Sequence, residues 1–172
     1  MKYLLYWLLI IQTSCSIAQP KKEQNSGTIL LDPDFTGKIS LYENISMSKI
    51  TAMVNNNIDE EDFVYFVING STKDLYHVKA YYFIAGYINE GWISKINALG
   101  IYVKPYDKAI PIYRESNDLS PTVATIPKNS NFIKVLDCNN SWLKIETSYE
   151  GTNINGWLEK KYQCDNPYNS CN

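Results

Sequence analysis

Side chains that could make or break covalent bonds are few in this sequence. The chain has a single histidine, His77, and no serine or cysteine stands in a motif that would pair with it as a nucleophile. A lone imidazole in a strand-like segment is more often a surface or core side chain than a catalytic base. Glycine-rich phosphate loops and paired-histidine metal motifs do not occur either. The sequence therefore favours a protein that is not an enzyme and needs no cofactor.

Acidic side chains could hold a cation, but their spacing does not favour it. Asp32 and Asp34 flank a proline, and residues 59–62 form an acidic run, yet neither stretch has the ligand spacing of a calcium loop. A zinc site built from His77 and the cysteines of the C-terminal third would lack the spacing of a zinc finger. Solvated turns explain the acidic stretches more simply, so no metal site is expected.

Aromatic side chains suit chemistry of another kind, the recognition of a ligand. The chain has 14 tyrosines and 4 tryptophans. Aromatic faces can stack on sugar rings or hold a peptide, and a guanidinium can add a charged contact. For each candidate taken singly, the alternative stays open that it is a surplus surface aromatic. The candidates near expected loops and strand edges are Tyr113, Arg114, Trp142, Tyr149 and Tyr162.

Short segments rich in Val, Ile, Tyr, Phe and Trp must position these side chains. Several of them alternate apolar and polar residues, which is typical of half-buried strands in an antiparallel all-β domain. Residues 46–55 differ, because Met47, Ile50 and Val54 stand at helical spacing behind a possible Ser46 cap. The sequence thus predicts an all-β fold with one short helical insert. The expected strands are 28–31, 38–42, 63–68, 76–83, 86–88, 91–93, 101–103, 109–113, 132–136, 142–146 and 156–158.

The same order of features occurs twice along the chain. Two copies of one module are therefore predicted, a divergent first domain at residues 28–100 and a second domain at 101–172 with a cysteine-containing C-terminal tail. The matching positions are Tyr42 with Tyr113, Val78 with Ile145, and Trp92 with Trp157.

Five short motifs follow one another in the second copy. They are Tyr113-Arg114, TIPKN at 125–129, an apolar segment at 132–136, WLKI at 142–145 and GWL at 156–158. This series resembles the bacterial SH3-like domain family, whose pattern runs from an arginine-bearing first strand through TxIPKG, a hydrophobic strand, WxKV and GWV. The resemblance implies that the protein consists of two tandem SH3-like small β-barrels.

The first copy departs from the family pattern. It lacks the arginine and the Pro-Lys turn, has Leu75 where Trp142 stands, and carries the acidic run at 59–62. Its assignment rests on the order of its strands and on Gly91-Trp92-Ile93.

The family resemblance also implies a function. It suggests a non-catalytic binding module that recognises cell-wall peptidoglycan or an envelope protein, through a groove between the long first loop and the Trp142 edge. The alternative is a structural or assembly component of an envelope complex without a dedicated ligand groove. Trp92 and Trp157 are expected in the core, because one buried tryptophan removes roughly 150 to 250 Å² from water and can fill much of a small barrel.

The N-terminus is typical of an exported protein. A lysine at position 2 precedes the apolar run 3–11, which is too short to span a bilayer, so residues 1–18 are predicted to be a signal peptide cleaved after Ala18. Residues 19–27 would form a flexible leader. A lipid anchor on Cys15 is the less favoured alternative. The mature chain is therefore expected outside the cytoplasm, periplasmic or secreted, with no transmembrane segment.

Charge and cysteine content set two further expectations. The formal net charge is −2 and the lysines are scattered among acids, which disfavours nucleic acid as a partner. Three cysteines would remain in an oxidising compartment after the signal peptide is removed. Cys164 and Cys171 flank a turn-forming stretch and are the favoured disulfide pair. Cys138 with Cys164 is the alternative.

Overall fold

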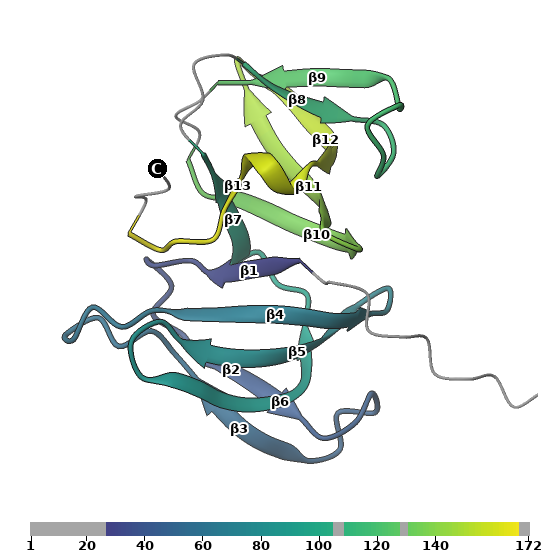
Figure 1. Ribbon diagram of the computed structural model, residues 1–172. Coiled ribbons are helices and arrows are strands. Elements are labelled where there is room, and N and C mark those ends of the chain that lie inside the picture. The colour runs from purple at the N-terminus through teal and green to yellow at the C-terminus, as the bar shows by residue number, and fades with distance from the viewer. Residues whose placement is uncertain (1–26, 105–108, 128–130, 169–172) are drawn as a thin grey trace, which may run out of the picture.

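The computed structural model describes residues 27–104, 109–127 and 131–168. In this part of the chain thirteen strands form an open antiparallel sheet, and one 3-10 turn precedes the last strand (Figure 1). The all-β prediction is confirmed. The elements are β1 (Thr28–Leu31), β2 (Ile39–Tyr42), β3 (Ile50–Val54), β4 (Val64–Ser71), β5 (Leu75–Tyr82), β6 (Gly86–Ser94), β7 (Leu99–Val103), β8 (Ile110–Tyr113), β9 (Thr122–Ile126), β10 (Ile133–Asn139), β11 (Trp142–Tyr149), β12 (Thr152–Leu158), η1 (Lys160–Tyr162) and β13 (Gln163–Cys164).

The predicted helical insert is wrong, because its residues form a β-hairpin. Glu43 N–H donates to the carbonyl of Lys49, which closes the turn between β2 and β3. Met47 has a φ of 55°, a left-handed conformation that an α-helix does not contain. β3 then pairs with β2 and buries Val54, while Met53 stays exposed. The β-branched side chains of this segment fit a strand better than a helix.

The sheet contains the same strand order twice. The first half runs β1-β4-β5-β6-β2-β3 and the second runs β7-β10-β11-β12-β8-β9. Antiparallel pairing of β1 with β7 joins the halves, so Figure 1 shows one half below this pair and one above it. The tandem barrels of SH3-like type remain a prediction.

The residues matched by sequence occupy equivalent places in the two halves. In the first half Tyr42 pairs with Trp92, and in the second Tyr113 pairs with Trp157. Likewise, β5 pairs with β6 and β11 pairs with β12. In both β6 and β12 a glycine stands directly before the tryptophan. The hairpins β2–β3 and β8–β9 also share their burial patterns. One set of cross-strand contacts is therefore built twice.

The core prediction for the two tryptophans is wrong. Trp92 and Trp157 are half-buried and lie outside the buried hydrophobic cluster that runs through both halves. Successive side chains of a strand point to opposite faces of the sheet. The residues on either side of each tryptophan therefore face the core, and the tryptophan faces outward. The buried neighbours are Gly91, Ile93, Gly156 and Leu158.

Residues 1–26, which include the predicted signal peptide, Cys15 and nearly all of the predicted leader, lie outside the described part of the chain. Gly27, the last residue assigned to the leader, belongs to the fold: it is buried, and its carbonyl accepts the N–H of Ile68. Within the described residues no helix has the length and apolar character needed to cross a membrane.

The cysteines exclude one of the two pairings considered. Cys138 is a free thiol, and Cys164 is disulfide-bonded, so the pair Cys138–Cys164 is not formed. Cys171, the favoured partner, lies outside the described residues, and its pairing stays a prediction. The Sγ atom of Cys138 accepts the N–H of Gly27 at 3.2 Å, and burial raises the pKa of this thiol.

Candidate functional site

Three of the five predicted binding residues come together in the second half. Tyr113 ends β8 and Trp142 begins β11, and their rings meet edge to face with centroids 5.4 Å apart and planes at 85°. Tyr162 ends η1, directly after β12. Burial raises the pKa of Tyr113, and the electrostatic influence of Tyr162 raises it further, as expected for neighbouring side chains. We call Tyr113, Trp142 and Tyr162 the aromatic site.

Strand pairing explains why the side chains of Tyr113 and Trp142 share one face. β12 lies between β8 and β11, with Trp157 opposite Tyr113 on one side and opposite Lys144 on the other. Directly opposed residues of antiparallel strands point to the same face. Trp142 stands two residues before Lys144 and therefore points to that face as well.

An ion pair borders the aromatic site. The Nζ atom of Lys161 lies 2.6 Å from Oε2 of Glu159 and 4.9 Å from the centre of the Tyr162 ring. The Glu159 carboxylate raises the pKa of the exposed Lys161 ammonium above its ordinary value, so this lysine is charged at neutral pH. The border can thus donate and accept hydrogen bonds beside the aromatic rings.

The long loop after β8 lies next to the start of β11. Arg114 begins this loop, is exposed, and donates its backbone N–H to the carbonyl of Pro121 at 3.0 Å. Further along, the Oγ atom of Ser116 accepts a hydrogen bond of 2.6 Å from the Asn139 side chain, in the turn that precedes Trp142. Arg114 therefore adjoins the aromatic site through its neighbour Tyr113.

Tyr149 is not part of this cluster. It ends β11 and pairs with Thr152 at the tip of the hairpin, whereas Trp142 stands at the other end of the same strand. Seven residues of extended chain separate the two, which is roughly 23 Å. Tyr149 is exposed, and a hydrogen bond with Glu150 raises its pKa.

Sequence reasoning missed the aromatic residues that line the outer face of the first half. The rings of Tyr65 and Tyr81 stack with centroids 5.1 Å apart, and Tyr87 meets Tyr81 edge to face at 5.4 Å. These three residues face one another across β4, β5 and β6. Their alternation with buried residues along each strand was the available signal.

His77 lies on the same sheet as this aromatic row, in contact with Trp92. The two ring centroids are 4.9 Å apart, and Nε2 of His77 lies 3.7 Å from Oε1 of Glu90. Among the described residues, no group of three or more His, Cys, Asp and Glu side chains is placed to hold a metal ion.

Comparison with known proteins gives limited guidance. No family model and no curated protein matches the chain. Two solved structures from Trichomonas vaginalis are similar to it. NlpC2 shares 20% identity with a TM-score of 0.34, and NlpC1 shares 19% identity with a TM-score of 0.35. The matches cover 83% and 85% of this chain but 49% and 48% of those proteins, so this chain spans about half of their length. A likeness at this level carries no argument about function.

Proposed function

We propose that this chain is a non-catalytic extracytoplasmic binding module that recognises cell-wall peptidoglycan at the aromatic site. The observation that carries the proposal is the edge-to-face contact of Tyr113 with Trp142 on an outer face of the sheet. The resemblance of the second half to bacterial SH3-like domains supplies the class of ligand.

The chemistry of the aromatic site suits such a ligand. Half-buried aromatic rings offer rigid apolar surface at a low entropic cost, which is why tyrosine and tryptophan are common in binding sites. Peptidoglycan presents sugar rings with apolar faces and short peptides with amide and carboxylate groups. The Glu159–Lys161 pair can bond the polar groups, and the Arg114 guanidinium can bind a carboxylate in a bidentate manner.

Co-sedimentation with purified sacculi tests the proposal. Residues 19–172 should pellet with the sacculi, and Trp142→Ala should weaken retention about tenfold or more, because it removes a central aromatic contact. Tyr149→Ala is the matched control, since it removes an exposed aromatic side chain of the same strand outside the aromatic site. Circular dichroism should show that all three proteins are folded.

The same assay separates the proposal from its alternatives. A folded protein that stays wholly in the supernatant would contradict peptidoglycan binding. It would instead favour an envelope protein as the ligand, or a structural role in an envelope complex. Equal loss of retention in Trp142→Ala and Tyr149→Ala would place the binding surface elsewhere on the molecule.

A further inference from the structure

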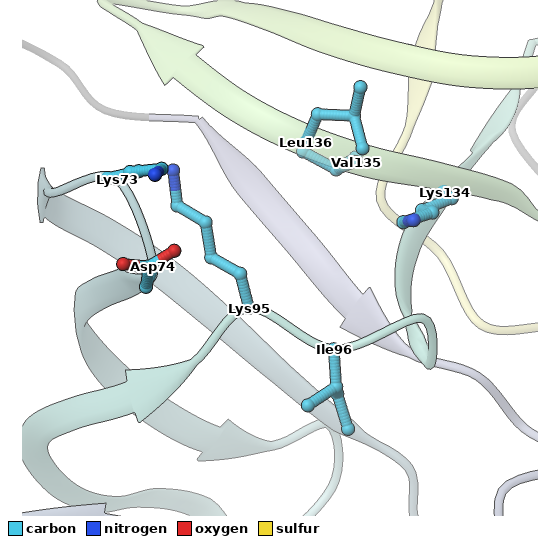
Figure 2. A pocket seen from close by; sticks show the side chains of 7 residues that line it. All are labelled: Lys73, Asp74, Lys95, Ile96, Lys134, Val135 and Leu136. Carbon is cyan, nitrogen blue, oxygen red and sulfur yellow. The ribbon is translucent and has the colours of Figure 1, made fainter.

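A cavity of about 240 Å³ lies at the junction of the two halves, built from residues that the aromatic site does not use (Figure 2). Three segments line it: the turn between β4 and β5, the link after β6, and the first part of β10. Figure 2 shows the β10 residues across the cavity from the turn and the link. The lining residues are Lys73, Asp74, Lys95, Ile96, Lys134, Val135 and Leu136.

The backbone holds the cavity open. The N–H of Lys95 donates to the carbonyl of Asp74 at 2.9 Å, which fixes the link against the turn. On the other side, β10 pairs with β7 through Ile133 and Lys134, and its later residues face the first half without such pairing. A bulge in β10 at Leu136 shifts the register there, and bulges commonly redirect a side chain.

One of the three lysines that line the cavity already forms an ion pair within the protein. The side chain of Lys95 is only 13% exposed, and its Nζ atom lies 3.0 Å from Oδ1 of Asp137 and 4.5 Å from the centre of the Tyr76 ring. Ser71 donates a hydrogen bond of 2.6 Å to the same carboxylate oxygen. Lys95 therefore joins the two halves, and its charge is already balanced by Asp137.

The other two lysines can reach a ligand. Lys73 is exposed and has no ion-pair partner within the described part of the chain. Lys134 places its Nζ atom 3.1 Å from Glu146, but that carboxylate is 49% exposed, and exposed ion pairs are weak. A bound carboxylate could thus take the place of Glu146 as the partner of Lys134.

We propose that this cavity binds the carboxylate end of a short peptide whose last residue is aliphatic. Lys73 and Lys134, which Figure 2 shows on opposite sides of the cavity, supply positive charge that attracts the carboxylate, and Ile96 with Leu136 packs against the side chain. The volume is below the roughly 300 Å³ at which sites for larger ligands begin, so only a short end of a peptide can lie inside it.

This inference does not rest on peptidoglycan binding, and its test uses a soluble probe. The mature chain is titrated with N-acetyl-alanyl-alanine, and the backbone amide resonances of Lys95, Ile96 and Leu136 are followed by NMR. We expect saturable shifts of these resonances with the free carboxylate and none with the C-terminal amide of the same peptide. Trp142→Ala should leave the titration unchanged.

Two substitutions locate the binding groups. Lys73→Gln and Lys134→Gln should each weaken binding by about threefold to tenfold, because each removes one charged donor. Lys49→Gln is the control, since this lysine pairs with Glu43 in the β2–β3 hairpin, outside the cavity. Equal response to the amide peptide, or no response to either peptide, would overturn the proposal. A response to acetate and inorganic phosphate as strong as that to the peptide would overturn the assignment to a peptide end.

Discussion

Gly91 and Gly156 occupy equivalent positions in the two halves, each beside a carbonyl oxygen of the preceding hairpin. A Cβ atom at Gly156 would lie 2.7 Å from the Tyr113 carbonyl oxygen and 2.6 Å from Cγ2 of Ile112. At Gly91 it would lie 2.8 Å from the Tyr42 carbonyl oxygen. In each Gly-Trp pair, the glycine thus lets two strands approach, while the tryptophan lies on the outer face.

Gly156→Ala should therefore destabilise the protein by about 1 to 3 kcal/mol, because the backbone of β8 must shift to admit the methyl group. Urea unfolding of the two proteins measures the difference. Gly70→Ala serves as the control, since its Cβ atom would meet only Cβ of His77 at an ordinary 3.6 Å. Equal destabilisation by both substitutions would contradict the close-approach explanation.

The positions of Tyr113 and Trp142 could be predicted from the sequence, because a motif placed each of them at a strand end. The position of Tyr149 at the far end of β11 could not, since its distance from Trp142 depends on the length of that strand. The cavity between the halves was equally hidden, because its lysines come from segments far apart in the chain.

At the scale of elements, the β3 segment shows that local spacing of apolar residues can predict a helix where a strand forms. Met47, Ile50 and Val54 have helical spacing, yet short apolar segments are ambiguous between helix and strand. Pairing with β2 decides for a strand, and the side chain of Ile50 is 50% exposed. The corresponding strand β9 was also missed, because it contributes a single buried residue, Ile126, to the core.

The hairpin assignment predicts a contrast between two neighbouring residues of β3. Val54→Ala should destabilise the protein by about 1 to 3 kcal/mol, since Val54 is buried in the core. Met53→Ala, which truncates a side chain that is 60% exposed, should change stability by less than about 0.5 kcal/mol. Thermal unfolding followed by circular dichroism checks both. A larger effect from Met53→Ala would contradict the orientation of this strand.

At the scale of the whole molecule, several contacts join the two halves besides the β1–β7 pairing. Lys95 and Ser71 of the first half both contact Asp137 of the second. The C-terminal tail also returns to the first half, where Tyr168 meets Phe63 and Phe83 edge to face at 5.4 and 5.5 Å. These contacts, together with one continuous hydrophobic cluster, explain why the halves share a sheet. The sequence repeat predicted two similar units but carried no information about this packing.

The contact at Asp137 predicts a dependence of stability on pH. Burial raises the pKa of this carboxyl, but hydrogen bonds from Ser71 and Lys95 outweigh that effect and hold the pKa below its ordinary value of 3.8. A lowered pKa contributes stability that is present above pH 3.8 and is lost as the pH falls through the folded-state value. The effect should be small, because the Asp137 side chain is 43% exposed to solvent.

Asp137→Asn should accordingly be less stable than the unaltered protein at neutral pH. The difference should shrink on acidification below pH 3.8, where the native carboxylate becomes protonated. Urea unfolding across a pH series measures both proteins. A difference that stays constant down to pH 2, or that grows on acidification, would contradict the ionised state of Asp137 in the folded protein.

The most direct test of peptidoglycan binding is an NMR titration of the mature chain with soluble peptidoglycan fragments. We predict saturable shifts at the indole N–H of Trp142 and at the backbone amides of Tyr113 and Tyr162, with little change at the amide of Tyr149. Trp142→Ala should abolish the shifts at Tyr113 and Tyr162. Shifts confined to the first half, or none at concentrations that saturate binding to sacculi, would contradict an aromatic binding site on the second half.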